Sequence, residues 1–146
     1  YTGLSLYNPI GSNYVLSLNK VGVGIAVTTA AAAVIGIATG TTTVPPSSVT
    51  AATAVRSAYV TGATPNSVGQ AYSVVTYGVG AATNGTTPVV HTVLGQTSTA
   101  ITLAPMLFDL EGSIVLPPGA FASLYLSTAS GASGTAASFQ WEEIPL

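Results

Sequence analysis

Apolar side chains recur at every second position along much of this chain, and short runs of Gly, Pro and Asn interrupt them. Near the carboxyl end, Phe121, Ser123, Tyr125 and Ser127 alternate with Ala122, Leu124 and Leu126. A period of two is that of a β-strand with one buried face. Similar alternation from Leu4 to Ile144 predicts about eight to ten short strands and no substantial helix. We therefore expect one all-β domain over residues 1–146, an antiparallel β-sandwich of jelly-roll type.

Turn-forming residues mark where these strands end. The segment Pro117-Pro118-Gly119 predicts a type II turn, because Pro fixes φ and Gly accepts the positive φ of the next position. Gly22 and Gly24 indicate a bulge or bend at which a strand crosses to another sheet. The uncharged stretch Val21–Gly40 is long enough to span a bilayer, but its Val, Ile and Thr residues are broken by Gly. We interpret it as two buried strands and not as a membrane segment.

Charge is very scarce in this sequence. Only six of 146 residues are Asp, Glu, Lys or Arg, and the net charge is −2. A chain this neutral has little electrostatic protection against association, so we expect a homo-oligomer, with a trimer favoured over a dimer. Two basic residues cannot neutralise a run of phosphates, which argues against nucleic acid as a partner. Ala, Thr, Ser and Gly make up about half of the chain and supply an uncharged, hydroxyl-rich surface.

Few residues remain that are suited to chemistry. The chain has no Cys and a single histidine, His91, which lies in an apolar strand without an evident partner. A metal site or a general base needs several such groups together, so we interpret His91 as structural or incidental. We predict no catalytic, cofactor-binding or metal-binding residues and no cofactor. The chain is not expected to be an enzyme.

Two pairs of carboxylates are the candidate exceptions. Asp109 and Glu111 are two positions apart on a predicted strand and would share a face, where backbone carbonyls could complete a divalent cation site. The favoured interpretation is a solvated outer face opposite Met106, Phe108 and Leu110. Glu142 and Glu143 are adjacent, so at least one of them is expected to be exposed.

Tyrosine is the most frequent aromatic residue. The seven tyrosines combine apolar area with a polar tip, which is favoured at interfaces and at sugar-binding faces. The alternative interpretation is that most of them are ordinary strand residues with hydrated hydroxyls. The alternating pattern also predicts a core that contains Leu16, Leu18, Ile25, Ile35, Phe108, Leu110, Leu124, Leu126, Phe139 and Trp141.

Two segments carry a resemblance to a known class of protein. The first is Gly3–Ser12 followed by Val15–Gly22, and the second is Asp109–Gly119 followed by Ser138–Pro145. Together they resemble small structural proteins of tailed bacteriophages that decorate or cement the capsid as β-sandwich trimers. The resemblance covers both ends of the chain, about half of it. It implies a location on the capsid surface of the virion, the major capsid protein as partner, and no active site.

The sequence therefore favours a viral structural protein, a capsid decoration protein that forms oligomers and stabilises the shell. Neutral surfaces suit this function because the cores of protein interfaces are depleted of charge. Two alternatives stay open, a virion receptor-binding head and a carbohydrate-binding β-sandwich module. Exposed aromatic side chains along one rim would favour either alternative, whereas an uncharged flat patch would favour the decoration protein.

Overall fold

The fold is seen in a computed structural model that describes residues 4–25, 31–42, 67–72, 89–100, 103–128 and 135–146. These residues contain eight strands and no helix, as the alternating pattern predicts. The strands are β1 (Ser5–Tyr7), β2 (Tyr14–Ile25), β3 (Val34–Thr41), β4 (Gln70–Tyr72), β5 (Val89–Gln96), β6 (Leu103–Leu116), β7 (Ala120–Leu126) and β8 (Thr135–Pro145). The all-β prediction is confirmed.

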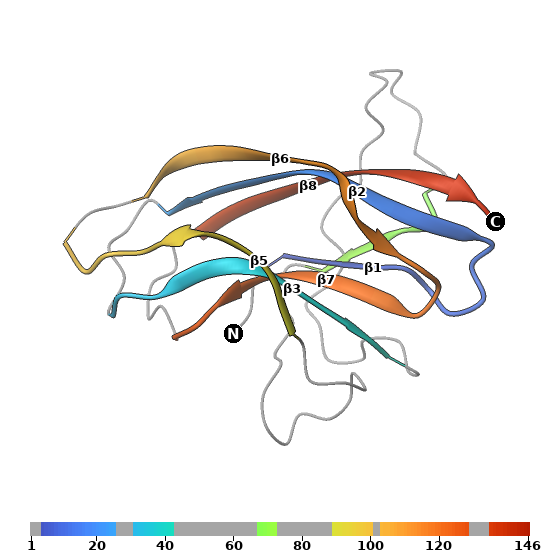
Figure 1. Cartoon of the computed structure of the whole chain (residues 1–146), viewed down its shortest axis with the longest axis horizontal. Coiled ribbons are helices and arrows are strands. Elements are labelled where there is room, and N and C mark those ends of the chain that lie inside the picture. Colours follow the sequence, from blue (N-terminus) through green and yellow to red (C-terminus); the bar gives the residue numbers. More distant parts are fainter. Residues whose placement is uncertain (1–3, 26–30, 43–66, 73–88, 101–102, 129–134) are drawn as a thin grey trace.

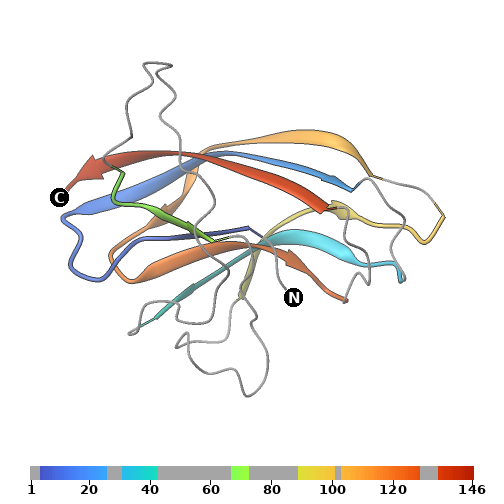
Figure 2. The ribbon, with the colours of Figure 1, turned by 180° about the vertical axis from the view of Figure 1, so that it is seen from behind.

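The strands form two antiparallel sheets that face each other (Figures 1 and 2). The five-stranded sheet has the order β4-β1-β7-β3-β5, and the three-stranded sheet has the order β6-β2-β8. β2 is the long central strand of the smaller sheet and pairs with β6 on one side and with β8 on the other. The predicted antiparallel sandwich is therefore confirmed, while its finer assignment as a jelly roll stays a prediction.

The core lies between the two sheets. Leu6 of β1, Leu18 of β2 and Ile37 of β3 are fully buried there, and alternate residues of β7 join them from the larger sheet. Seven of the ten predicted core residues are buried: Leu16, Leu18, Ile25, Ile35, Leu110, Leu124 and Leu126. Phe108, Phe139 and Trp141 are half-buried and pack against the core. Their strands, β6 and β8, are the edges of the smaller sheet, which explains their partial exposure.

The predicted turn at Pro117-Pro118-Gly119 carries the chain from one sheet to the other. Gly119 has a φ of 84°, and the N–H of Ala120 donates to the carbonyl of Pro117 at 2.9 Å. A positive φ before a closing hydrogen bond is the pattern expected when Gly occupies the third position of a type II turn. The chain thus passes from β6 in the three-stranded sheet to β7 in the five-stranded sheet.

A buried asparagine joins this turn to the β1–β2 connection. Asn8 is fully buried, and its Nδ2 donates to the carbonyls of Tyr14 and Leu116, both at 2.8 Å. The main chain of Asn8 also forms two hydrogen bonds with the turn. Its N–H donates to the carbonyl of Ala120, and its carbonyl accepts the N–H of Gly119. One side-chain amide therefore donates to a buried carbonyl at the end of β6 and to a partly buried carbonyl at the start of β2. From the sequence, Asn8 is recognised only as a turn residue.

The prediction for Gly22 and Gly24 is partly wrong. A register shift relative to β6 does lie between Val23 and Ile25, but β2 continues in the same sheet and does not cross to the other. The glycines instead allow close packing by neighbouring strands, since a Cβ on Gly24 would lie 3.3 Å from Pro105 and one on Gly22 would lie 2.7 Å from Ser138 Oγ.

The long uncharged stretch divides into strands as predicted. Its described parts are the end of β2 and most of β3, with residues 26–30 outside the described ranges. Among the residues that the structure describes, there is no helix with the length and apolar character to cross a membrane.

Candidate functional site

Asp109 and Glu111 are exposed on β6, but the regular alternation that would place them on one face is broken there. Glu111 has a φ of 51° and Gly112 a φ of 71°, and the pairing register with β2 shifts at this point. Asp109 Oδ1 accepts the N–H of Glu111 at 3.0 Å, and Asp109 Oδ2 lies 3.4 Å from Lys20 Nζ. The Glu111 N–H, more than Lys20, holds the pKa of Asp109 below its ordinary 3.8. Asp109 therefore binds its own strand and a neighbouring lysine.

His91 lies on the exposed side of β5, where its Nδ1 is 2.9 Å from Thr92 Oγ1. Within the described ranges, no three His, Cys, Asp or Glu side chains gather in a group that could hold a metal ion. His91 also borders a crevice of about 400 Å³ between the two sheets, which is lined by Thr39, Thr41, Ser113, Val115 and Pro117 among others. The crevice brings hydroxyl groups and apolar side chains together without a carboxylate.

Glu143 is the carboxylate with the most hydrogen bonds in the described part of the chain. Its Oε1 accepts from Ser67 Oγ at 2.5 Å, from the N–H of Gly69 at 2.9 Å and from Trp141 Nε1 at 3.2 Å. Its Oε2 accepts from the N–H of Val68 at 3.2 Å. We call these five residues the Glu143 anchor. The adjacent Glu142 is exposed, as predicted for at least one of this pair.

The anchor fastens the edge of one sheet to the edge of the other. Glu143 lies on β8, and residues 67–69 lead directly into β4, the short outer strand of the larger sheet. Gly69 is buried against the Trp141 indole, where an added Cβ would lie 2.9 Å from Nε1. Burial acts to raise the pKa of Glu143, but the donors of Ser67, Gly69, Val68 and Trp141 outweigh it and lower that pKa below 4.5. The ionised carboxylate is therefore the form that the anchor holds.

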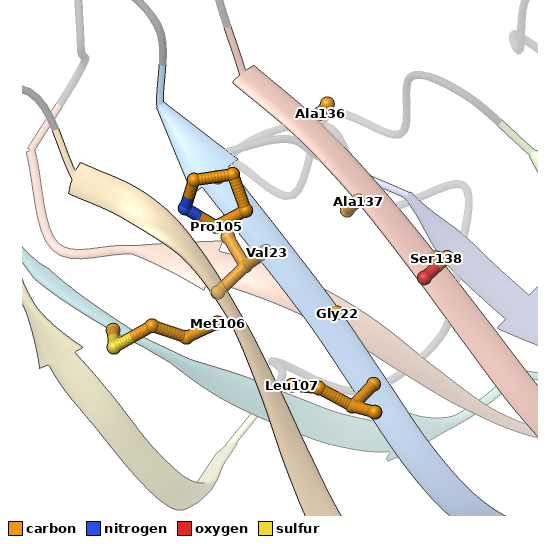
Figure 3. A pocket seen from close by; sticks show the side chains of 9 residues that line it. Gly22, Val23, Pro105, Met106, Leu107, Ala136, Ala137 and Ser138 are labelled. Atoms are coloured by element: carbon orange, nitrogen blue, oxygen red, sulfur yellow. The ribbon is translucent and has the colours of Figure 1, made fainter.

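A shallow apolar trough lies on the outer face of the three-stranded sheet (Figure 3). Its volume is about 380 Å³, and Gly22 and Gly24 form its floor because they leave the backbone of β2 uncovered. Pro105 and Leu107 of β6 border one side, and Ala136 and Ser138 of β8 border the other. The trough has no charged lining residue and fits an apolar surface better than a polar ligand.

The outer strand β5 exposes apolar side chains at the far edge of the larger sheet. Val89 is 69% exposed and Val93 is 64% exposed. β5 pairs with β3 on one side, and no described strand pairs with its other side. Within the described ranges, the outer edge of β5 therefore has no strand partner.

Charge is distributed very unevenly between the two sheets. The five charged side chains of the described ranges all lie on the three-stranded sheet: Lys20 on β2, Asp109 and Glu111 on β6, and Glu142 and Glu143 on β8. The five strands of the larger sheet contain no Asp, Glu, Lys or Arg. The larger sheet is thus an uncharged layer, and the sequence alone cannot reveal this because the charges are scattered along the chain.

The aromatic side chains do not form an exposed platform in the described part of the molecule. Tyr7 is buried, and Tyr14, Tyr72 and Tyr125 are half-buried. Tyr1, Tyr59 and Tyr77 lie outside the described residues. Stacking against a sugar requires an accessible ring face, so the described tyrosines give no support to a glycan-binding rim.

Comparison with known proteins finds no matching protein-family model, no similar curated protein and no similar solved structure. Functional conclusions must therefore come from the residues and surfaces of this chain. The candidate functional features are surfaces for association, namely the uncharged larger sheet, the exposed valines of β5 and the apolar trough.

Proposed function

We propose that this protein is a capsid decoration protein that forms homo-oligomers on a viral shell and stabilises it. The observation that carries this proposal is the absence of charged side chains from all five strands of the larger sheet. Protein interfaces exclude charge from their buried centre, so a charge-free layer is suited to burial against other chains. The bacteriophage resemblance of the two terminal segments supplies the class of particle.

The mechanism follows from burial of neutral surface. Each copy would contact neighbouring subunits of the major capsid protein through uncharged area and bridge them. A single contact of this kind is weak, but many copies on one shell act together and gain avidity. The charged side chains of the three-stranded sheet, among them Lys20, Asp109 and Glu142, are exposed or partly exposed and would stay in contact with solvent.

The proposal is tested on particles prepared with and without the protein. Particles that lack it are expected to assemble and to rupture at a lower temperature, because the bridging contacts between shell subunits are missing. Adsorption to host cells is measured on the same particles. Unchanged rupture would contradict the proposal, and unchanged rupture combined with failed adsorption would identify a receptor-binding head instead.

A further inference from the structure

Glu143 is bound by neutral donors in the described part of the chain. Three of them, Ser67 Oγ, the N–H of Gly69 and Trp141 Nε1, donate to the same oxygen, Oε1, and the N–H of Val68 donates to Oε2. A protonated carboxyl group accepts fewer hydrogen bonds than a carboxylate, and bonds to an ionised group are about twice as strong as neutral ones. The anchor therefore depends on the negative charge of Glu143.

The titratable groups around Glu143 in the described structure do not replace that charge. On β2, Lys20 forms its ion pair with Asp109 of β6. On β8, the neighbouring Glu142 is exposed. In β4, burial raises the pKa of the Tyr72 phenol above 10, so this group stays neutral in acid. A change in the charge of Glu143 itself is therefore what alters the anchor at low pH.

The segment that the anchor holds has few other contacts among the described residues. Residues 67–69 lead into β4, which pairs with β1 over three residues. Val68 is half-buried and packs against the core, and Gly69 lies against the Trp141 indole. Segments with few buried apolar contacts open locally at a lower free-energy cost than core strands do. Loss of the anchor should therefore affect residues 67–72 before the rest of the described fold.

The chain as a whole has little reason to unfold in acid. It contains four Asp and Glu residues, two Lys and Arg residues and one His. Complete protonation of the carboxyls therefore leaves three positive side chains in 146 residues, and repulsion between so few charges is weak. Asp109, Glu111 and Glu142 are exposed, so solvent screens their interactions. The main response to acid should arise at Glu143.

We propose that Glu143 is an acid-operated latch: protonation of its carboxylate releases residues 67–72 from β8 and β1 while the rest of the two sheets stays folded. The pKa of Glu143 in the folded chain lies below the ordinary 4.5, so the segment stays attached above that value. As the pH falls from 4.5 through the folded pKa, attachment weakens about ten-fold per pH unit and then becomes level. Release would expose the Trp141 ring. This inference does not depend on the proposed function.

Trp141 is the single tryptophan of the chain, so its fluorescence reports on this contact directly. Quenching by acrylamide and far-ultraviolet circular dichroism are measured on the same samples between about pH 2.5 and 7. We expect quenching to increase below pH 4.5 while the strand signal stays unchanged. Hydrogen exchange, corrected for its intrinsic pH dependence, locates the change. Protection of the N–H groups of Val68 and Gly69 should fall about ten-fold per pH unit in this range, whereas that of Leu18 in β2 should persist.

Variants assign the acid response to one carboxyl group. Glu143→Gln should show low protection at Val68 and Gly69 at every pH, because its amide carries no charge and does not titrate. Ser67→Ala keeps the carboxylate and removes one donor, so the folded pKa should move toward the ordinary 4.5 and the acid response should become smaller. It answers the same question if Glu143→Gln does not fold. Glu142→Gln is the matched control and should behave as the wild type.

The outcomes decide between a local latch and other responses to acid. Loss of protection at Val68 and Gly69 in acid that is absent from Glu143→Gln and smaller in Ser67→Ala supports the latch. An equal loss at Leu18 would show that the whole chain unfolds and would overturn it. Quenching and protection that stay constant down to about pH 2.5 would overturn it as well. So would an acid response that Glu143→Gln retains. Particle rupture tests the proposed function separately from these measurements.

Discussion

The two sheets of this sandwich use a nearly uncharged sequence in different ways. The three-stranded sheet holds all five charged side chains of the described residues and has an outer face with an ion pair between Lys20 and Asp109. The five-stranded sheet has no such charge, and its strand β1 is buried on both faces, since Leu6 points to the core while its neighbours Ser5 and Tyr7 are also buried. A low average charge is therefore not spread evenly, and one layer is almost free of the groups that keep proteins apart.

The buried polar residues show the same contrast. In the larger sheet, Ser123 Oγ donates to Ser5 Oγ at 2.7 Å, and Ser5 Oγ donates to the carbonyl of Ala122. These neutral hydroxyls satisfy one another without a charge. The smaller sheet instead uses a carboxylate, Glu143, to bind backbone and side-chain donors. Neutral bonds suit a buried layer, whereas the carboxylate is tolerated because it is only partly buried.

The largest effect should come from a matched pair of leucines on the two sheets. Leu124 of β7 is fully buried, and Leu124→Ala is expected to lower the free energy of unfolding by about 2–5 kcal/mol. Leu107 of β6 is 62% exposed, and Leu107→Ala should change it by less than about 0.5 kcal/mol. Urea denaturation of both variants measures the difference. Equal effects would break the distinction between the inner face of one sheet and the outer face of the other.

The junction between the sheets should show the next largest effect. Asn8→Ala removes the Nδ2 donor from the buried carbonyl of Leu116, and also from the partly buried carbonyl of Tyr14, which still accepts from Ser12 Oγ. A buried acceptor that is left without a donor costs about 1–3 kcal/mol, so the midpoint temperature of thermal unfolding should fall clearly. Ser12→Ala is the control, because Ser12 is less buried than Asn8 and its hydroxyl donates to Asn8 Oδ1 and to the carbonyl of Tyr14. A larger loss from Ser12→Ala than from Asn8→Ala would contradict the role assigned to Asn8.

A smaller effect is expected where the charged sheet holds the edge of the uncharged one. Glu143→Gln replaces the carboxylate that binds Ser67, Gly69 and Trp141. Partial exposure weakens such bonds, so we expect a loss of about 1 kcal/mol in the free energy of unfolding. Hydrogen exchange at the N–H groups of Val68 and Gly69 should become faster. Glu142→Gln, at the exposed neighbouring position, should leave that exchange unchanged.

The smallest effect concerns pH, and it should arise from the three-stranded sheet. The pKa values of Asp109 and Glu143 lie below their ordinary 3.8 and 4.5. A carboxyl with a lowered pKa in the folded chain stabilises the fold above its unfolded pKa, and that stabilisation is lost as pH falls through the folded value. Stability should therefore be nearly level above about pH 5 and decline below the ordinary carboxyl pKa.

Variants assign this decline to individual carboxyls. In Glu143→Gln the free energy of unfolding should fall less steeply as the pH is lowered. The reason is that the stabilisation by the ionised Glu143 carboxylate is already absent from this variant at neutral pH. Asp109→Asn should do so to a smaller extent, since Asp109 is exposed and solvent screens its interactions. Denaturation curves between about pH 2.5 and 7 would measure both. An acid decline that is identical in wild type and Glu143→Gln would show that the anchor does not hold the ionised form.

Local sequence pattern was sufficient for most of the described strands and for most of the core. The alternation around Leu124 and Leu126 places both side chains inward, and Pro117-Pro118-Gly119 forms the expected turn. The prediction failed where contacts between strands decide the geometry. Gly22 and Gly24 leave room for the close approach of Ser138 and Pro105, which lie far away in sequence. The positive φ of Glu111 likewise accompanies a register shift between β6 and β2. The two-residue spacing of Asp109 and Glu111 in the sequence does not predict that shift.

What the sequence determined by itself is the fold class, the faces of the strands and the scarcity of charge, because each depends on composition or on neighbouring residues. Only the tertiary structure decided which strands lie at the edges and that β5 is left with exposed valines. It also decided that the charges gather on one sheet and that Glu143 meets residues 67–69, which are 74–76 positions away. These features depend on pairing between distant strands, and the alternating pattern of one strand does not specify its partner.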